Sequence, residues 1–233
     1  MEGELEKATV IHLREVSSTN DEVLRLRGSV PLPFFVRADV QRAGRGRMGR
    51  EWISDLGGLW MSGLLERRHP RDNYKMMLGG ALAVARVVER EASIRPEVHF
   101  PNDVMVGGKK LAGILVEERD GLLIVGVGLN VNQAEPPLPT ATTLRLITGR
   151  TYAMDVMADR LAAEILRMHS LPFGEVFALW KGNLATLGRY VVLSMANGRT
   201  LRGRLLDITE DMLLLMEGGV SVPAEHVLNV RRL

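Results

Sequence analysis

The chain has 233 residues, 46% of them hydrophobic and 25% charged, which is ordinary for a globular protein and leaves room for one large domain and a small one. Lys and Arg number 30 and Asp and Glu 28, so the net charge of +2 gives no reason to expect a nucleic-acid or membrane partner. The absence of cysteine excludes disulfides, thiolate metal sites and a cysteine nucleophile, and it fits a reducing compartment. Residues 1–7 contain no apolar stretch typical of a signal peptide or membrane span, so the predicted location is the cytoplasm.

The first part of the chain predicts strands that alternate with helices. A strand is expected at 9–16, followed by a short helix that begins after Ser18 and ends at Gly28. An apolar stripe with a spacing of about 3.6 residues predicts a helix between Tyr74 and Val88. Further strands, with β-branched or aromatic residues and bordering glycines, are predicted at 34–40, 58–65, 111–117 and 121–129.

The second part predicts helices and then a change of texture. A stripe from Met154 to Met168 predicts one helix, and a second helix is expected through Phe177 and Trp180. From Gly188 onward the pattern is short strands with tight turns. This tail predicts a small all-β barrel that docks on the larger domain, because roughly 45 residues is below the size that usually folds without support.

The expected organisation is therefore an α+β fold with two parts. Residues 1–186 would form a mixed sheet with flanking helices, and residues 187–233 would form the small barrel. No internal repeat or low-complexity segment interrupts either part.

The segment "QRAGRGRMGREW", residues 41–52, contains glycines with the G-x-G-x-x-G spacing of a dinucleotide-binding fingerprint. That interpretation needs a long helix after the glycines, but Gly57-Gly58 falls where its second turn should be. The interleaved arginines instead predict a mobile loop whose guanidinium groups suit a carboxylate or a phosphate; they are Arg42, Arg45, Arg47 and Arg50.

Polar groups also interrupt the apolar period in three other segments, 18–20, 99–113 and 126–132. Taken singly, these segments would be a helix cap, a turn with a solvated lysine pair, and a loop. The sequence has no phosphate-binding P-loop motif, no nucleophile elbow and no H-E-x-x-H, and its five histidines lack ligand spacing. Standard hydrolase and zinc-site interpretations are therefore excluded.

In their order and spacing these segments together resemble the biotin protein ligase family. The matching motifs are Ser18-Thr19-Asn20, Gln41, Gly44-Arg45-Gly46-Arg47, Gly49-Arg50-x-Trp52, Gly57-Gly58-Leu59-Trp60, Pro101-Asn102-Asp103, Lys109 to Glu117, and Gly126-x-Gly128-x-Asn130-Val131-Asn132. The tail is similar to the family's small SH3-like domain, so the resemblance covers almost the whole chain. It implies a class II synthetase-like catalytic domain in residues 1–186.

The resemblance implies an ATP-dependent biotin-[acetyl-CoA-carboxylase] ligase that uses biotin, ATP and Mg²⁺. Biotin and ATP would give biotinyl-5′-adenylate, and biotin would then pass to a lysine of a biotin carboxyl carrier domain. The implied catalytic cations are Arg47 and Lys110, which would stabilise negative charge near the α-phosphate.

The resemblance also assigns binding residues. Biotin contacts carry over to Ser18, Thr19, Asn20, Gln41, Arg45, Gly46, Arg47, Lys110 and Gly113. ATP and adenylate contacts carry over to Arg47, Arg50, Trp52, Asn102, Asp103 and Asn130. Metal ligands are not assigned, although ligand chemistry suggests that Asp103 helps to hold Mg²⁺ indirectly.

Three residues depart from the family's pattern. His99-Phe100 stands where Lys-Trp is common, and Met48 stands where another basic residue is often found, so the affinity for adenylate is expected to differ. Trp60 is expected to be a core residue.

Bifunctional members carry an N-terminal DNA-binding domain, whereas the first predicted strand here starts near residue 9. The expectation is a monofunctional ligase that does not bind DNA and forms a homodimer by analogy with the family.

Two alternatives stay open. One is a lipoate or octanoate ligase or transferase of the same fold, and the other is a non-catalytic module that binds RNA or protein through the barrel. Gly-Arg-Gly-Arg with Lys-Lys-Leu-Ala-Gly favours biotin, because an acyl chain would need an apolar slot. For RNA the tail offers only Tyr190 as an aromatic among its basic residues.

Overall fold

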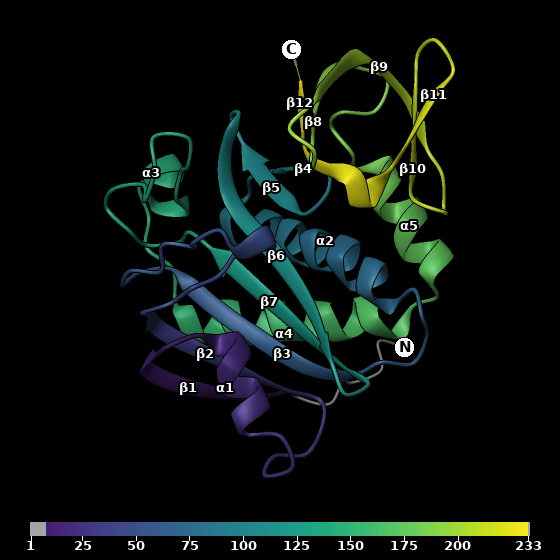
Figure 1. Ribbon diagram of the computed structural model, residues 1–233. Helices are drawn as coiled ribbons and strands as arrows, with labels where there is room; N and C mark the ends of the chain where they lie inside the picture. The colour runs from purple at the N-terminus through teal and green to yellow at the C-terminus, as the bar shows by residue number, and fades with distance from the viewer. Residues whose placement is uncertain (1–7, 233) are drawn as a thin grey trace, which may run out of the picture.

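The computed structural model describes residues 8–232 (Figure 1). Residues 1–7, whose composition argued against a signal peptide, lie outside the described residues, as does Leu233. In chain order the elements are β1 (Thr9–Val16), α1 (Thr19–Arg25), β2 (Phe34–Gln41), the 3₁₀ turn η1 (Arg47–Gly49), β3 (Leu59–Glu66), α2 (Asp72–Ala92), β4 (Glu97–His99), β5 (Asp103–Val106), β6 (Lys109–Arg119), β7 (Leu122–Leu129), α3 (Leu144–Thr148), α4 (Met154–Ser170), α5 (Phe173–Gly182), β8 (Tyr190–Met195), β9 (Thr200–Ile208), β10 (Leu213–Met216), β11 (Val220–Pro223), the 3₁₀ turn η2 (Ala224–His226) and β12 (Val227–Arg232).

The larger sheet has seven strands in the order β1-β2-β3-β7-β6-β5-β4. Only β1 and β2 pair in parallel, and every other pair in it is antiparallel, so the sheet is mixed. Side chains alternate between its faces. Phe35 and Val125 pack into the core beneath α2 and α4, whereas Phe34 and Ile124 pack with Val23 of α1 on the other face. Helices thus cover both faces, which explains the continuous burial along β3.

The smaller sheet has five antiparallel strands in the order β11-β10-β9-β8-β12. Its inner residues, such as Val191 and Leu205, belong to the same buried cluster as the core of the larger sheet. Ion pairs add to this packing, since Lys181 Nζ lies 2.5 Å from Asp207 Oδ1 and Arg71 lies 2.8 Å from Asp211. The sheet begins at Tyr190, and a domain boundary at 186/187 stays a prediction.

The expected α+β fold is confirmed, with its mixed sheet, flanking helices and separate β module. Trp60 is fully buried, as expected of a core residue. Four short elements were not predicted: β4, β5, β12 and α3. β4 and β5 have three and four residues and flank the turn at Pro101, so neither is long enough to show a period.

Among the described residues, no helix combines the length and apolar character needed to cross a membrane.

A buried polar cluster fastens the first turn of α2 to the end of α4. Lys75 Nζ lies 2.8 Å from Asp72 Oδ1 and donates to the backbone oxygen of His169 at 3.0 Å. The His169 ring bonds the backbone oxygen of Glu66, at the end of β3, at 2.9 Å. Burial, and secondarily the charge of Lys75, lowers the pKa of His169, so the folded protein holds this ring neutral.

Stability should therefore depend on pH through His169. The unfolded chain takes up a proton near pH 6.5, whereas the folded chain resists it until lower pH, so the free energy of unfolding should fall as the pH drops below about 6.5. In His169→Gln this fall should be smaller. Urea unfolding between pH 7.5 and 5 would measure both slopes, with the exposed His226→Gln as control. Equal slopes for wild type and His169→Gln would contradict the assignment.

Candidate functional site

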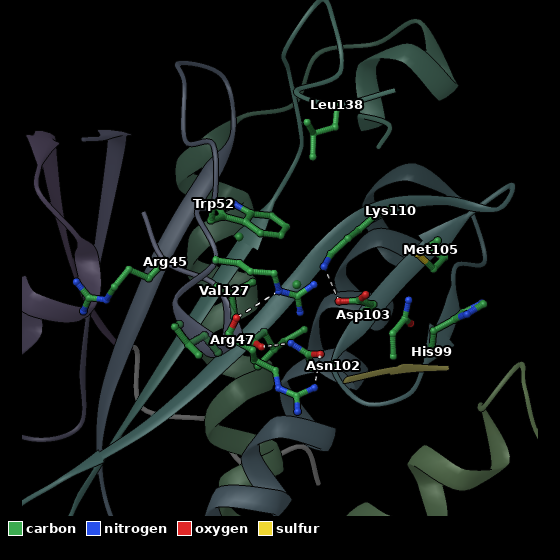
Figure 2. A pocket seen from close by; sticks show the side chains of 18 of the residues that line it. Arg45, Arg47, Trp52, His99, Asn102, Asp103, Met105, Lys110, Val127 and Leu138 are labelled. Carbon is green, nitrogen blue, oxygen red and sulfur yellow. Dashed lines mark hydrogen bonds and ion pairs between the residues drawn. The ribbon is translucent and has the colours of Figure 1, made fainter. Parts of the chain in front are cut away.

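A cavity of about 750 Å³ opens on the face of the larger sheet that also carries α1. Its walls are the open face of β6 and β7, the loop between β2 and β3, the β5 region and the edge of β12 (Figure 2). All but one of the predicted site residues line it: Ser18, Thr19, Asn20, Gln41, Arg45, Gly46, Arg47, Arg50, Trp52, Asn102, Asp103, Lys110 and Gly113. Asn130 is not among the lining residues; it is buried, and its Oδ1 accepts from Gln133 at 3.4 Å. A role for Asn130 in ATP binding stays a prediction.

The glycine-arginine loop folds back on itself and does not enter an α-helix. Gly46 N–H donates to the carbonyl of Arg50 at 2.7 Å, and Trp52 N–H donates to the carbonyl of Gly44 at 2.9 Å. Only the short η1 turn lies between them. A Cβ on Gly44 would lie 2.4 Å from the carbonyl oxygen of Trp52, so the two arms can approach only with glycine there. The dinucleotide interpretation is therefore excluded, as the sequence indicated.

At the bottom of the cavity, strand β7 presents two glycines in place of side chains. Gly126 and Gly128 point toward the cavity, and a Cβ on them would lie 2.5 Å from Asn20 Oδ1 and 2.3 Å from Trp52 Nε1. The indole of Trp52 therefore packs directly against the backbone of β7 at Gly128. Its Nε1 is buried against this strand and has no hydrogen-bond partner among the described residues.

Strand pairing sets the order of groups along this floor. Ser62 of β3 pairs with Gly126, while Asp103 of β5 pairs with Gly113, which pairs in turn with Gly128. The hydroxyl and amide groups of residues 18–20 lie near Gly126, two residues along β7 from Gly128, which Trp52 covers. Lys110 lies beyond that row, seven residues from Glu117 along β6, or roughly 23 Å of strand. The cavity therefore runs from a neutral polar end to a charged end.

Two arginines of the loop are held differently. Arg45 makes a bidentate pair with Asp21 at 2.6 and 2.8 Å, and hydrogen bonding by Asp21 raises the pKa of Arg45. Figure 2 shows its side chain pointing away from Lys110. Arg47 has no carboxylate within ion-pair distance among the described residues and donates only to Asn102 Oδ1 at 3.4 Å. Burial, with the nearby charge of Arg50, lowers the pKa of Arg47, so an entering anion would relieve a disfavoured cation.

Lys110 is fixed both by its backbone and by its side chain. Its N–H donates to Thr140 and its carbonyl accepts from Thr142, both at 2.9 Å. Its Nζ lies 2.6 Å from Asp103 Oδ1 and 5.1 Å from the centre of the Trp52 ring (Figure 2). Lys109, next along β6, is exposed. Successive residues of a strand point to opposite sides, so only one of the two lysines faces the cavity.

Several lining residues were not recognised as site residues from the sequence. They are Glu51, Glu97, Met105, Leu138, Thr140 and the residues of β12 from Leu228 to Arg232. His99, noted only as a departure from the family pattern, also lines the cavity and bonds Glu97 at 2.9 Å. Arg231 and Arg232 belong to no motif recognised in the sequence, and only the docking of the small sheet brings them to the cavity.

The fold is that of an α+β domain, and its cavity has a neutral polar end and a cationic end. A model of the biotin/lipoate A/B protein ligase family matches residues 13–133, more than half of the chain. The chain belongs to this family.

The relatives agree with this assignment. The chain is 31% identical to the bifunctional ligase/repressor BirA of Bacillus spizizenii over 89% of this chain and 69% of the relative. It is 30% identical to the biotin--[acetyl-CoA-carboxylase] ligase of Mycobacterium tuberculosis over 93% and 87%. Among solved structures, biotin protein ligase from Aquifex aeolicus in complex with biotin and ATP is 31% identical, with a TM-score of 0.82 over 97% of this chain and 99% of that one.

Replacing Gly128 by alanine should displace Trp52. The added methyl would overlap the indole, so we expect a loss of about 1–3 kcal/mol in the free energy of unfolding and altered tryptophan fluorescence. Gly182→Ala adds a methyl to open space at the end of α5 and should change stability by less than about 1 kcal/mol. Urea unfolding of both variants measures the difference; similar small effects would show that the glycine floor tolerates side chains.

Proposed function

We propose that this chain is a biotin protein ligase that makes biotinyl-5′-adenylate from biotin and ATP and then transfers biotin to a lysine of a carrier protein. The observation that carries the proposal is the arrangement of the cavity, in which hydroxyl and amide groups lie at one end and Arg47 and Lys110 at the other. The relatives named as ligases and the solved complex with biotin and ATP support it.

The polar end suits the ureido ring of biotin. Thr19 and Gln41 are held together by two hydrogen bonds to Gln41 Oε1, from Thr19 N at 2.8 Å and from Thr19 Oγ1 at 2.9 Å. A ureido ring presents two N–H donors and one carbonyl acceptor, and hydroxyl and amide groups can meet both kinds. Arg45, held by Asp21 beside Asn20, would act there mainly by fixing the loop.

The charged end suits the reacting groups. A carboxylate oxygen of biotin attacks the α-phosphorus of ATP, the bond to the bridging oxygen breaks, and pyrophosphate leaves. Two anions must approach each other in this step, so preformed cations lower its barrier. In the second step the carrier amine attacks the acyl carbon and AMP leaves, with the amine proton lost to solvent or base. Lys110 and Arg47 would balance the charge of the phosphate in both steps.

The Mg²⁺ expected from the sequence would bind mainly through the phosphates of ATP. A hard cation takes oxygen ligands, and Asp103 offers a carboxylate at the charged end. Among residues 8–232 no group of three His, Cys, Asp or Glu side chains is placed to hold a metal. Asp103 would thus contribute to a site completed by the nucleotide.

The carrier is expected to be the biotin carboxyl carrier domain of a biotin-dependent carboxylase. A homodimer and a cytoplasmic location also stay proposals, based on the family and on the absence of cysteine. Light scattering on the purified chain would test the dimer.

The family model also covers lipoate ligases, so lipoate is the competing substrate. Incubating the protein with ATP, Mg²⁺, a carrier domain and either biotin or lipoate, followed by mass analysis of the carrier, tests the proposal. We expect the mass of one biotinyl group on the carrier and none with lipoate; the reverse result would establish the alternative.

Lys110→Ala should lower both adenylate formation and transfer by a factor on the order of a hundred or more, because one preorganised cation serves both steps. Lys110→Arg should recover only part of the activity, since a planar fork does not fit the place of a compact ammonium. Lys109→Ala is the matched control and should change little. Rapid-quench assays of pyrophosphate release and carrier labelling separate the steps. Near-normal rates for Lys110→Ala in both would remove it from the mechanism.

Arg47→Gly should weaken retention of the adenylate more than its formation. The guanidinium on the loop would restrain the bound phosphate, and its loss should let the intermediate escape to label bystander lysines. Mass analysis of a mixture of carrier and an unrelated protein provides the measurement. Labelling confined to the carrier, as expected for wild type, would contradict this role.

A further inference from the structure

Behind the polar end lies a chain of hydrogen bonds that reaches two residues outside the cavity. Asn20 lines the cavity but is only 6% exposed, so the partners of its amide are fixed by the protein. Its Nδ2 donates to Glu117 Oε2 at 2.6 Å, and its Oδ1 accepts from Ser62 Oγ at 2.5 Å. Neither Glu117 nor Ser62 lines the cavity.

The direction of each bond follows from the chemistry of its ends. An ionised carboxylate can only accept, so Glu117 selects the nitrogen of Asn20 and turns the oxygen toward Ser62. Ser62 has one proton, and giving it to Asn20 leaves its oxygen as an acceptor toward Thr19, 2.6 Å away. A flip of the Asn20 amide would place its oxygen against the carboxylate and its nitrogen against Ser62.

The far end of the chain is fixed in the same way. Ser54 donates to the carbonyl of Trp52 at 2.9 Å, so it accepts from Gln41 Nε2, at 2.8 Å, and turns Gln41 Oε1 toward Thr19. The single hydroxyl proton of Thr19 therefore has two acceptors within reach, Gln41 Oε1 at 2.9 Å and Ser62 Oγ at 2.6 Å. In this hydrogen-bond network the Asn20 amide contacts both Glu117 and Ser62, so its orientation depends on these two residues.

Burial makes this dependence strong. Ser62 is 0% exposed, and a Cβ on Gly126 would lie 2.5 Å from Asn20 Oδ1, so water has little room to replace a lost partner. Glu117 is held in turn by Arg45, whose Nη2 lies 3.8 Å from Glu117 Oε2. The glycine-arginine loop is thereby linked to the direction of the Asn20 amide.

We propose that Glu117 and Ser62 are positioning residues that set which way the Asn20 amide points, and so which of its hydrogen-bonding groups face the ureido ring of biotin. The free N–H of Asn20 Nδ2 and the second lone pair of Oδ1 are what remain for a ligand. This inference rests on the proposed function, because it assumes that biotin occupies the polar end.

The test is a set of single and double variants assayed for KM and kcat. Ser62→Ala and Glu117→Gln should each raise the KM for biotin by about five- to tenfold, the size of one lost or misdirected buried hydrogen bond, while kcat and the KM for ATP change less than about twofold. Glu117→Asp, which keeps the carboxylate, should recover part of the loss.

Two matched controls separate position from packing. Glu118→Gln removes the neighbouring carboxylate of β6, which bonds Arg67 at 2.9 Å and Asn73 at 3.0 Å instead of the site. Thr186→Val removes a buried hydroxyl that has no hydrogen-bond partner among the described residues. Both controls should keep the wild-type KM for biotin.

A double-variant cycle tests whether Glu117 and Ser62 act through Asn20. If Glu117 and Ser62 act through Asn20, their substitution in an Asn20→Ala background should change the KM for biotin by less than about twofold. Full, additive losses in that background would overturn the proposal, as would unchanged KM in the single variants. Calorimetric titration of biotin into the wild-type chain comes first: absence of any binding would refute the proposed function, whereas binding without the coupling would refute this inference alone. Thermal unfolding of every variant identifies any that fails to fold. If Ser62→Ala or Glu117→Gln fails to fold, the cycle is made with Glu117→Asp and Asn20→Ala instead.

Discussion

The site depends on one constraint, the close approach of side chains to the part of β7 where two glycines leave the cavity face bare. Asn20 comes from α1 and Trp52 from the loop after β2, and they meet the backbone of β7 at Gly126 and Gly128 so closely that a Cβ on either glycine would clash with them. The floor aligns the polar end and the indole along a single strand. The charged end follows from the same pairing, because β6 lies beside β7 and carries Lys110 at its start.

The three cations Arg45, Arg47 and Lys110 of the cavity differ in how their charges are balanced. Arg45 is paired with Asp21, whereas the half-buried Arg47 has no carboxylate within ion-pair distance in the described part of the chain. Lys110 is intermediate, since it pairs with Asp103 and lies over the Trp52 ring. An anion that reaches Lys110 must compete with Asp103 for its ammonium group. Anion binding at the charged end therefore requires the Lys110–Asp103 pair to rearrange.

The small sheet belongs to the site as much as to the fold. Its strand β12 contributes a wall of the cavity, and its core is continuous with the buried cluster under the larger sheet. Arg231 is therefore held at the cavity by the packing of the small sheet. The sequence predicted a small barrel that docks on the larger domain, but nothing in a run of short strands says which edge of the barrel meets that domain.

The sequence by itself determined the long elements and the chemistry of the site. Apolar stripes of 3.6 spacing are local, so α2 and α4 were predictable, and the motifs around Arg47 and Lys110 were specific enough in combination to indicate the family. Tertiary structure decided which side chains face the cavity. It turned Arg45 toward Asp21, kept Asn130 outside the lining, brought β12 to the cavity, and placed Ser62 and Glu117 against the Asn20 amide. These contacts join residues that are 24 to 97 positions apart in the chain, and no local pattern encodes a hydrogen bond across such a separation.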